Sequence, residues 1–104
     1  MKKLNFETSG LIPVVVQEEK SCEVLMLGYT NRQALQLTLK TGYVYFWSRK
    51  RKKIWLKGES SGNKLRVKNI FTDCDRDTLL IKADLIGSAA CHRGYKSCFM
   101  EKIY

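Results

Sequence analysis

Three of the four cysteines stand where their thiolates could converge on one metal ion. Cys91 and Cys98 lie seven positions apart in a segment that contains Gly94, so the backbone can fold back and bring both thiols to one ion. With Cys74 they supply three thiolates, which leaves the fourth tetrahedral position of zinc for water, the pattern of a catalytic site. Cys22 could instead close the shell and make the site structural. For any one free cysteine, a small buried hydrophobe is the alternative.

The single histidine, His92, directly follows Cys91. Neighbouring side chains point in opposite directions where the backbone is extended, so joint ligation of one ion by both residues is geometrically awkward. A purely structural histidine is the plain alternative. Beside a metal-bound water, however, an imidazole can serve as a general acid or base. His92 is therefore the catalytic candidate.

Three aspartates, Asp73, Asp75 and Asp77, alternate with Cys74 and Arg76. Carboxylate oxygens suit a hard ion such as Mg²⁺. If the segment is extended, the three aspartates share one face, but the outer pair lies about 13 Å apart. They would converge on one Mg²⁺ only if the segment curls or if waters fill in. The alternative is a polar strand–turn junction with solvated acids.

A cationic and aromatic stretch, residues 47–63, is the candidate binding surface for phosphate. It holds five consecutive cations at 49–53, flanked by Trp47 and Trp55. Cations beside aromatic rings suit phosphates and a flat base, and they suit single-stranded nucleic acid equally well. The hydroxyl and N–H groups of residues 60–62 could add phosphate contacts. Solvated lysines and partly buried tryptophans are the structural alternative.

Short runs of β-branched and aromatic residues predict that strands position these groups. The expected strands span residues 11–17, 23–29, 43–47, 54–57, 65–71 and 78–86. Asn31 is expected to cap a helix at 32–40, with Gly42 just past its end. The segment 87–99 should be mostly loop. Strands outnumber helices, so the expected class is α+β, with a mostly antiparallel sheet and one main helix.

Length and composition limit the class of protein. The chain has 104 residues, 44% of them hydrophobic, and a formal net charge of +9, so a single domain over residues 1–104 is expected. No apolar run approaches the roughly 20 residues of a membrane span, and the N-terminus has no apolar signal core. We therefore expect a cytoplasmic protein, where four cysteines favour metal over disulfides. The charge favours an anionic partner.

Taken together, these motifs resemble the phosphoribosyl-AMP cyclohydrolase family, which acts at the third step of histidine biosynthesis. The resemblance runs from about Gly10 to Phe99, in order and with short gaps. The matching residues are Gly10-Leu11-Ile12-Pro13, Glu23-Val24-Leu25-Met26-Leu27, Tyr29, Asn31, Phe46-Trp47-Ser48-Arg49, Arg51, Trp55, Lys57-Gly58-Glu59, Ser61-Gly62-Asn63, Asp73-Cys74-Asp75, Asp77, Cys91-His92, Gly94 and Ser97-Cys98-Phe99.

The resemblance implies a hydrolase that opens the N1–C6 bond of the adenine ring in N1-(5-phosphoribosyl)-AMP, using Zn²⁺ and Mg²⁺. It also implies an intertwined homodimer, whose zinc site takes one cysteine from one subunit and two from its partner. Carried over residue by residue, the zinc ligands are Cys74, Cys91 and Cys98, and the magnesium ligands are Asp73, Asp75 and Asp77. The candidates for substrate binding are Trp47, Ser48, Arg49, Arg51, Lys57, Glu59, Ser61, Gly62 and Asn63.

Two departures from the family pattern stand beside His92. Arg93 and Tyr95 occupy positions that are threonine and histidine in many relatives, which weakens any role for a second histidine. Cys22 matches no family ligand.

In the implied mechanism, zinc lowers the pKa of its bound water toward about 7, and the resulting hydroxide attacks C6. His92 would remove or return a proton as the C6–N1 bond breaks. A zinc-stabilised RNA-binding domain is the alternative, with residues 49–53 on phosphates and Trp47 or Tyr45 stacked on bases. The three aspartates would hinder RNA binding, so we expect neither a nucleic-acid nor a membrane partner. A structural zinc protein would need Cys22 or His92 as a fourth ligand.

Overall fold

The computed structural model describes residues 4–6 and 9–104, which form six strands and one helix. The elements in chain order are β1 (Ile12–Glu18), β2 (Val24–Thr30), α1 (Arg32–Thr41), β3 (Tyr45–Ser48), β4 (Lys53–Leu56), β5 (Lys64–Thr72) and β6 (Leu79–Ile86). Each predicted element is present, with boundaries that shift by one or two residues. Tyr43 lies ahead of β3 and forms an isolated bridge to Arg66.

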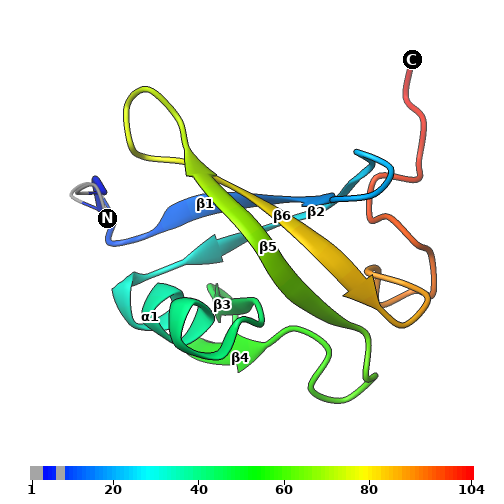
Figure 1. Ribbon diagram of the computed structural model, residues 1–104, viewed down its shortest axis with the longest axis horizontal. Helices are drawn as coiled ribbons and strands as arrows, with labels where there is room; N and C mark the ends of the chain where they lie inside the picture. Colours follow the sequence, from blue (N-terminus) through cyan, green and yellow to red (C-terminus); the bar gives the residue numbers. More distant parts are fainter. Residues whose placement is uncertain (1–3, 7–8) are drawn as a thin grey trace.

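Two hairpins build the main sheet. β1 pairs with β2 and β5 pairs with β6, both antiparallel, whereas β1 and β6 pair in parallel. The strand order is therefore β2-β1-β6-β5 (Figure 1). A third antiparallel pair, β3 with β4, forms a separate small sheet. The predicted α+β class with a mostly antiparallel sheet is confirmed, with the β1–β6 contact as its one parallel pairing.

The helix begins at the predicted residue and ends one residue later than predicted, at Thr41. The Asn31 Oδ1 atom accepts a hydrogen bond from the Ala34 backbone nitrogen at 2.8 Å, and Gly42 ends the helix in the left-handed region at φ 79°. Figure 1 shows α1 and the β3–β4 hairpin on the same side of the main sheet. Among the described residues, no helix has the length and apolar character needed to cross a membrane.

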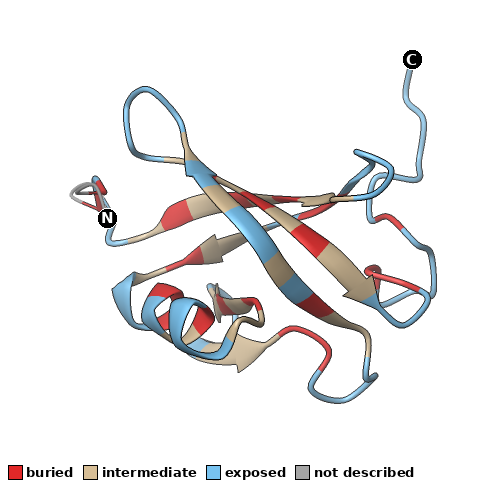
Figure 2. Ribbon diagram, in the orientation of Figure 1, coloured by how far each residue is buried: buried red, intermediate tan, exposed pale blue. Residues whose placement is uncertain are grey.

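The core lies between the main sheet and this second layer. Alternate residues of β1 and β6 are buried, including Val14, Val16 and Ile81, so one face of the sheet points inward (Figure 2). Phe46 of β3 packs against β2 at Gly28. A Cβ atom at position 28 would lie 2.6 Å from the Phe46 ring, so glycine is required for this close approach of strand and ring.

The opposite face of the main sheet carries an apolar row across all four strands. Val15 pairs with Leu27 on one side and Leu80 on the other, and Leu80 pairs with Phe71. Directly paired residues point to the same face. Leu27 and Phe71 are exposed by 44% and 51%, while Val15 and Leu80 are half-buried. We call Leu27, Val15, Leu80 and Phe71 the outer apolar row.

Candidate functional site

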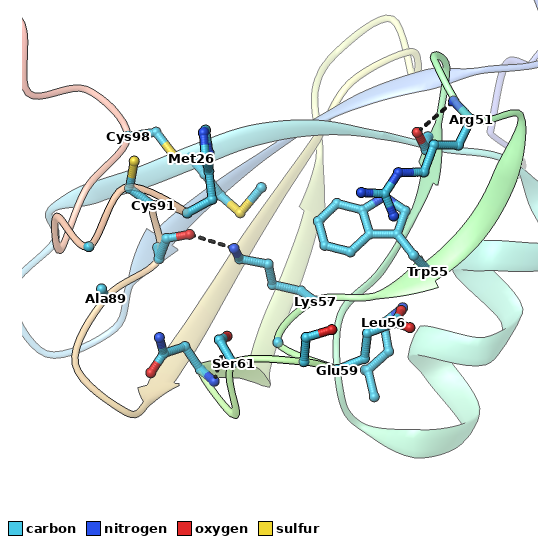
Figure 3. Close-up of a pocket in the computed structure, with 17 residues that line it drawn as sticks. Met26, Arg51, Trp55, Leu56, Lys57, Glu59, Ser61, Ala89, Cys91 and Cys98 are labelled. Carbon is cyan, nitrogen blue, oxygen red and sulfur yellow. Dashed lines mark hydrogen bonds between the residues drawn. The ribbon is translucent and has the colours of Figure 1, made fainter.

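A cavity of about 710 Å³ lies where the β3–β4 hairpin, the loop 57–63 and the segment 87–98 meet (Figure 3). The sequence-predicted residues that line it are Ser48, Arg51, Lys57, Glu59, Ser61, Asn63, Cys91, His92 and Cys98. The cavity thus brings together the catalytic candidate, two candidate zinc ligands and six candidates for substrate binding. Trp47, Arg49 and Gly62 do not line it.

The loop 57–63 is a tight turn that glycine makes possible. Gly58 has a φ of 85°, and a Cβ atom there would lie 2.5 Å from the Asn63 backbone. The Gly62 nitrogen donates to the Gly58 carbonyl at 2.8 Å, which closes the turn. The Glu59 carboxylate accepts a hydrogen bond from the Leu56 nitrogen at 3.0 Å. Glu59 therefore stabilises the loop on the cavity wall with one of its oxygens.

The segment 87–98 brings two thiols together. The backbone nitrogen of Cys91 donates to the Tyr95 carbonyl at 3.0 Å, and the chain turns back at Gly94, whose φ is 90°. The Cys98 nitrogen then donates to the Leu25 carbonyl of β2 at 2.7 Å, and this hydrogen bond holds the end of the segment against β2. His92 and Cys91 both line the cavity because this backbone is turned, not extended.

The environment of the two thiols suits a soft metal ion. Burial, followed by the neighbouring Cys91 thiol, raises the pKa of Cys98, while Lys57 acts in the opposite direction. The Cys91 Sγ atom accepts a weak hydrogen bond from the Arg93 nitrogen at 3.5 Å. Two adjacent sulfur donors in a partly buried cavity match the ligand preference of zinc. The pair could hold such an ion together with a third protein ligand, which is the usual number in catalytic zinc sites.

Cys74 lies in the turn of the β5–β6 hairpin, at the end away from Cys91 and Cys98. It belongs to the connection between β5 and β6, whereas Cys91 and Cys98 follow the other end of β6 (Figure 1). The seven residue steps of β6 span about 23 Å at the usual strand rise. Within the described residues of one chain, therefore, Cys74 does not join the other two cysteines. The exposed Cys22 does not line the cavity either.

The three aspartates beside Cys74 converge because their segment curls. The segment is a turn with a positive φ of 60° at Arg76, and the extended geometry is wrong for it. One carboxylate oxygen from each of Asp73, Asp75 and Asp77 lies within 4.8 Å of the others. Partial desolvation, followed by a hydrogen bond and charge repulsion from Asp73, raises the pKa of Asp77. This oxygen cluster fits a hard divalent ion such as Mg²⁺.

The cations of the 47–63 stretch divide between different surroundings. Arg51 lines the cavity, and its backbone nitrogen donates to the Ser48 hydroxyl at 3.0 Å (Figure 3). The Arg49 guanidinium instead stacks on the Tyr29 ring, 3.9 Å from its centroid. Lys57 is buried, and its ammonium donates to the Ala90 carbonyl. Burial lowers the pKa of Lys57, whereas the Cys98 and Cys91 thiols favour its charged form.

Several further residues line the cavity, and two of them, Trp55 and Ser60, belong to the stretch 47–63 that was predicted to bind phosphate. Both alternatives for Trp55 hold, because its ring packs against Phe46 at 5.5 Å between ring centroids and it also lines the cavity. Its position two residues before Lys57 places both on one face of β4 and its extension, which is a usable signal. The cavity residues that the sequence analysis did not propose as site residues are Met26, Leu56, Gly58, Ala89, Ala90 and Gly94.

The chain is similar to proteins of one family along almost its whole length. A family model described as phosphoribosyl-AMP cyclohydrolase matches residues 26–100. A curated protein of that name from Desulfotalea psychrophila is 52% identical to this chain, and the similarity covers all of this chain and 84% of the relative. Another, from Archaeoglobus fulgidus, is 52% identical over 97% of this chain and 93% of the relative. A third, from Pelotomaculum thermopropionicum, is 54% identical over 99% of this chain and 79% of the relative. None of these similarities favours the RNA-binding alternative.

Proposed function

This chain belongs to the phosphoribosyl-AMP cyclohydrolase family and is therefore an enzyme, and from that premise we propose its reaction. It hydrolyses the N1–C6 bond of the adenine ring in N1-(5-phosphoribosyl)-AMP, as a zinc-dependent step of histidine biosynthesis. The observation that carries the proposal is the cavity itself. Cys91, His92 and Cys98 line the same space as Arg51 and Trp55. Metal donors, a proton carrier, a cation and an aromatic ring thus face one ligand-sized volume.

The cavity chemistry suits a phosphorylated purine. Its volume of about 710 Å³ falls in the usual range of roughly 300–1,000 Å³ for small-molecule sites. Arg51 offers a guanidinium, which binds phosphate oxygens in pairs. Ser60 and Ser61 offer hydroxyls to the same anion, and the Trp55 ring offers a flat surface to a base. These residues would bind and orient the substrate.

Zinc would be held by Cys91 and Cys98 of one subunit together with Cys74 of a second copy. The adjacent thiols on the cavity wall support this ligand set, because two soft donors already face each other there. The chemistry that zinc supplies when bound is activation of a water molecule at neutral pH. Three protein ligands are the number found in catalytic sites.

His92 would handle the proton of the reaction. Water adds oxygen to C6, and N1 must receive a proton as the C6–N1 bond breaks. His92 lines the cavity next to Cys91 and has the side chain suited to carry that proton from the attacking water to N1. The balance is complete, because one water molecule is consumed and no other reactant is required.

The proposal requires a homodimer, and the outer apolar row supports one. Cys74 lies at the end of the hairpin remote from the cavity, so a three-cysteine site is incomplete without a second copy. Leu27 and Phe71, at the two ends of the row, are exposed apolar side chains on opposite edge strands of the sheet. Pairing of this face with a second copy would cover them and is the contact we propose.

Magnesium would bind at the aspartate cluster. Its three carboxylates repel one another, and a divalent cation relieves that repulsion. Because Asp73 and Asp75 flank Cys74, the contact that delivers this cysteine to a partner's zinc site also brings the magnesium site close to it. The ion would then lie at the border of the cavity.

The decisive experiment is turnover of N1-(5-phosphoribosyl)-AMP to the ring-opened aminoimidazole carboxamide product, followed by absorbance. The metal-free protein is assayed alone, with zinc, with magnesium and with both ions. We expect conversion that requires zinc and that a zinc chelator abolishes. Folded, zinc-loaded protein that converts no substrate would overturn the proposed reaction, and conversion without zinc would overturn its metal dependence.

A further inference from the structure

Lys57 is a buried cation at the centre of the candidate site. Only 9% of the residue is exposed, and it directly follows β4. Its backbone nitrogen donates to the Val44 carbonyl at 3.1 Å, which fixes the main chain at this position. A buried ammonium is costly unless it is hydrogen-bonded and its charge is compensated. The partners of Lys57 therefore indicate what it does.

The first partner is the backbone of the segment that carries the candidate zinc ligands. The Lys57 Nζ atom donates to the carbonyl of Ala90, the residue immediately before Cys91 (Figure 3). A second link joins the same two segments, because the Asn63 Oδ1 atom accepts from the Ser88 nitrogen at 3.2 Å. The loop 57–63 thus holds the segment 87–91 at two points, one of them through a charged group.

No carboxylate of the described residues forms an ion pair with Lys57. The Trp55 ring lies 5.8 Å from the ammonium, which is a cation–π contact and supplies no neutralising charge. The groups whose charge acts on Lys57 are the Cys98 and Cys91 sulfurs. The compensating anion for this cation must therefore come from the side of the cavity where the two cysteines lie.

Charge accounting connects Lys57 to the metal. Zn²⁺ with three thiolates carries a net charge of −1. In a partly desolvated cavity wall, a nearby cation stabilises such a negative charge. We propose that Lys57 is a positioning residue for zinc: its ammonium offsets the negative charge of the thiolate-bound metal, and its hydrogen bond to Ala90 fixes the backbone of Cys91. The inference rests on the proposed zinc site and replaces the phosphate-binding role predicted for Lys57.

The test is the zinc affinity of the full chain, measured by competition with a chromophoric chelator. The variants are Lys57→Met and Lys57→Arg, and the matched control is Lys40→Met, which removes one lysine charge from the exposed last turn of α1. We expect Lys57→Met to weaken zinc binding by about 10–100-fold, the usual effect of removing a group that supports metal ligands. Lys57→Arg should restore most of the affinity, and Lys40→Met should change nothing.

Each outcome decides the proposal. Unchanged affinity in Lys57→Met overturns it, and equal losses in the Met and Arg variants overturn the role of the charge. Circular dichroism of the metal-free variants checks folding. If Lys57→Met does not fold, Lys57→Gln, which keeps a donor without the charge, must show the loss instead.

Parallel turnover assays separate this proposal from the proposed function. A wild-type chain that binds zinc but converts no substrate would overturn the reaction and leave the affinity test of Lys57 valid. A wild-type chain that binds no zinc would overturn both the metal centre and the role of Lys57.

Discussion

Asn63 and Ser88 are 25 positions apart in the sequence, yet the Asn63 side chain accepts a hydrogen bond from the Ser88 nitrogen at 3.2 Å. The contact joins the turn that borders the cavity to the segment that carries Cys91 and Cys98. Gly87 makes it possible, because a Cβ atom there would lie 2.0 Å from the Asn63 Oδ1 atom. The loop 57–63 and the segment 87–98 are therefore held together by a direct hydrogen bond.

Replacing Asn63 should weaken the contact between the loop 57–63 and the segment 87–98. Asn63→Ala leaves the Ser88 nitrogen without this acceptor, so we expect a loss of about 0.5–1.5 kcal/mol in the free energy of unfolding. Asn63→Asp keeps an acceptor oxygen and should retain most of the stability. Urea unfolding measures both, with the exposed Asn69→Ala as the control. Equal stability of Asn63→Ala and wild type would argue against the link.

Two inactive variants should restore each other if the zinc site is shared. Cys74→Ala and Cys91→Ala are each expected to lose zinc and turnover. When equal amounts are unfolded and refolded together, half of the dimers are mixed, and each mixed dimer holds one intact site of two. The mixture should therefore recover about a quarter of wild-type turnover. A site formed within one chain predicts no recovery at any mixing ratio.

A charge in the outer apolar row should separate the subunits. Leu27→Lys places an ammonium at a position that is 44% exposed, so the fold of one chain should tolerate it while the paired face would not. We expect a shift from dimer to monomer in analytical ultracentrifugation, together with loss of bound zinc. Leu39→Lys is the matched control, because Leu39 is 50% exposed on α1 outside the row. A dimer that persists in Leu27→Lys would place the contact elsewhere.

Acid should weaken the ion pair that joins Glu18 of β1 to Lys96 of the segment 87–98. The Lys96 ammonium, 2.8 Å from Glu18, and then the Ser21 hydroxyl hold the pKa of Glu18 below its usual value. A lowered folded-state pKa contributes stability above the unfolded value of about 4.3, and that stability is lost as the pH falls through the folded-state pKa.

Glu18→Gln should therefore destabilise the protein at pH 7 but progressively less below about pH 4.3. Urea unfolding across this range measures the difference between the two proteins. The control is Glu101→Gln, in the exposed C-terminal segment. A constant difference at every pH would show that the Glu18 charge is not responsible.

Local patterns were sufficient for the secondary structure and for the types of ligand. A run of β-branched residues indicated strands such as β1, and Asn31 and Gly42 marked the ends of α1, because strand propensity and caps depend on residues close in sequence. Thiols and carboxylates are likewise visible in the sequence as soft and hard ligands. The family was also recognisable from the order of its motifs.

Relationships between distant segments required the tertiary structure. The curl that gathers Asp73, Asp75 and Asp77 depends on a positive φ at Arg76, which residue type does not reveal. The burial of Lys57 against Ala90, 33 positions away, had no signal in the sequence, and most of the other lysines among the described residues are exposed.

The sequence by itself determined which elements form, which residues are candidate metal ligands and which family the chain resembles. Only the tertiary structure decided which of those residues meet within one chain. β6 runs beside β1 and separates Cys74 from Cys98 by the length of a strand, because strand pairing is set by long-range contacts. The same chain therefore holds three suitable thiols but brings only two of them to its own cavity.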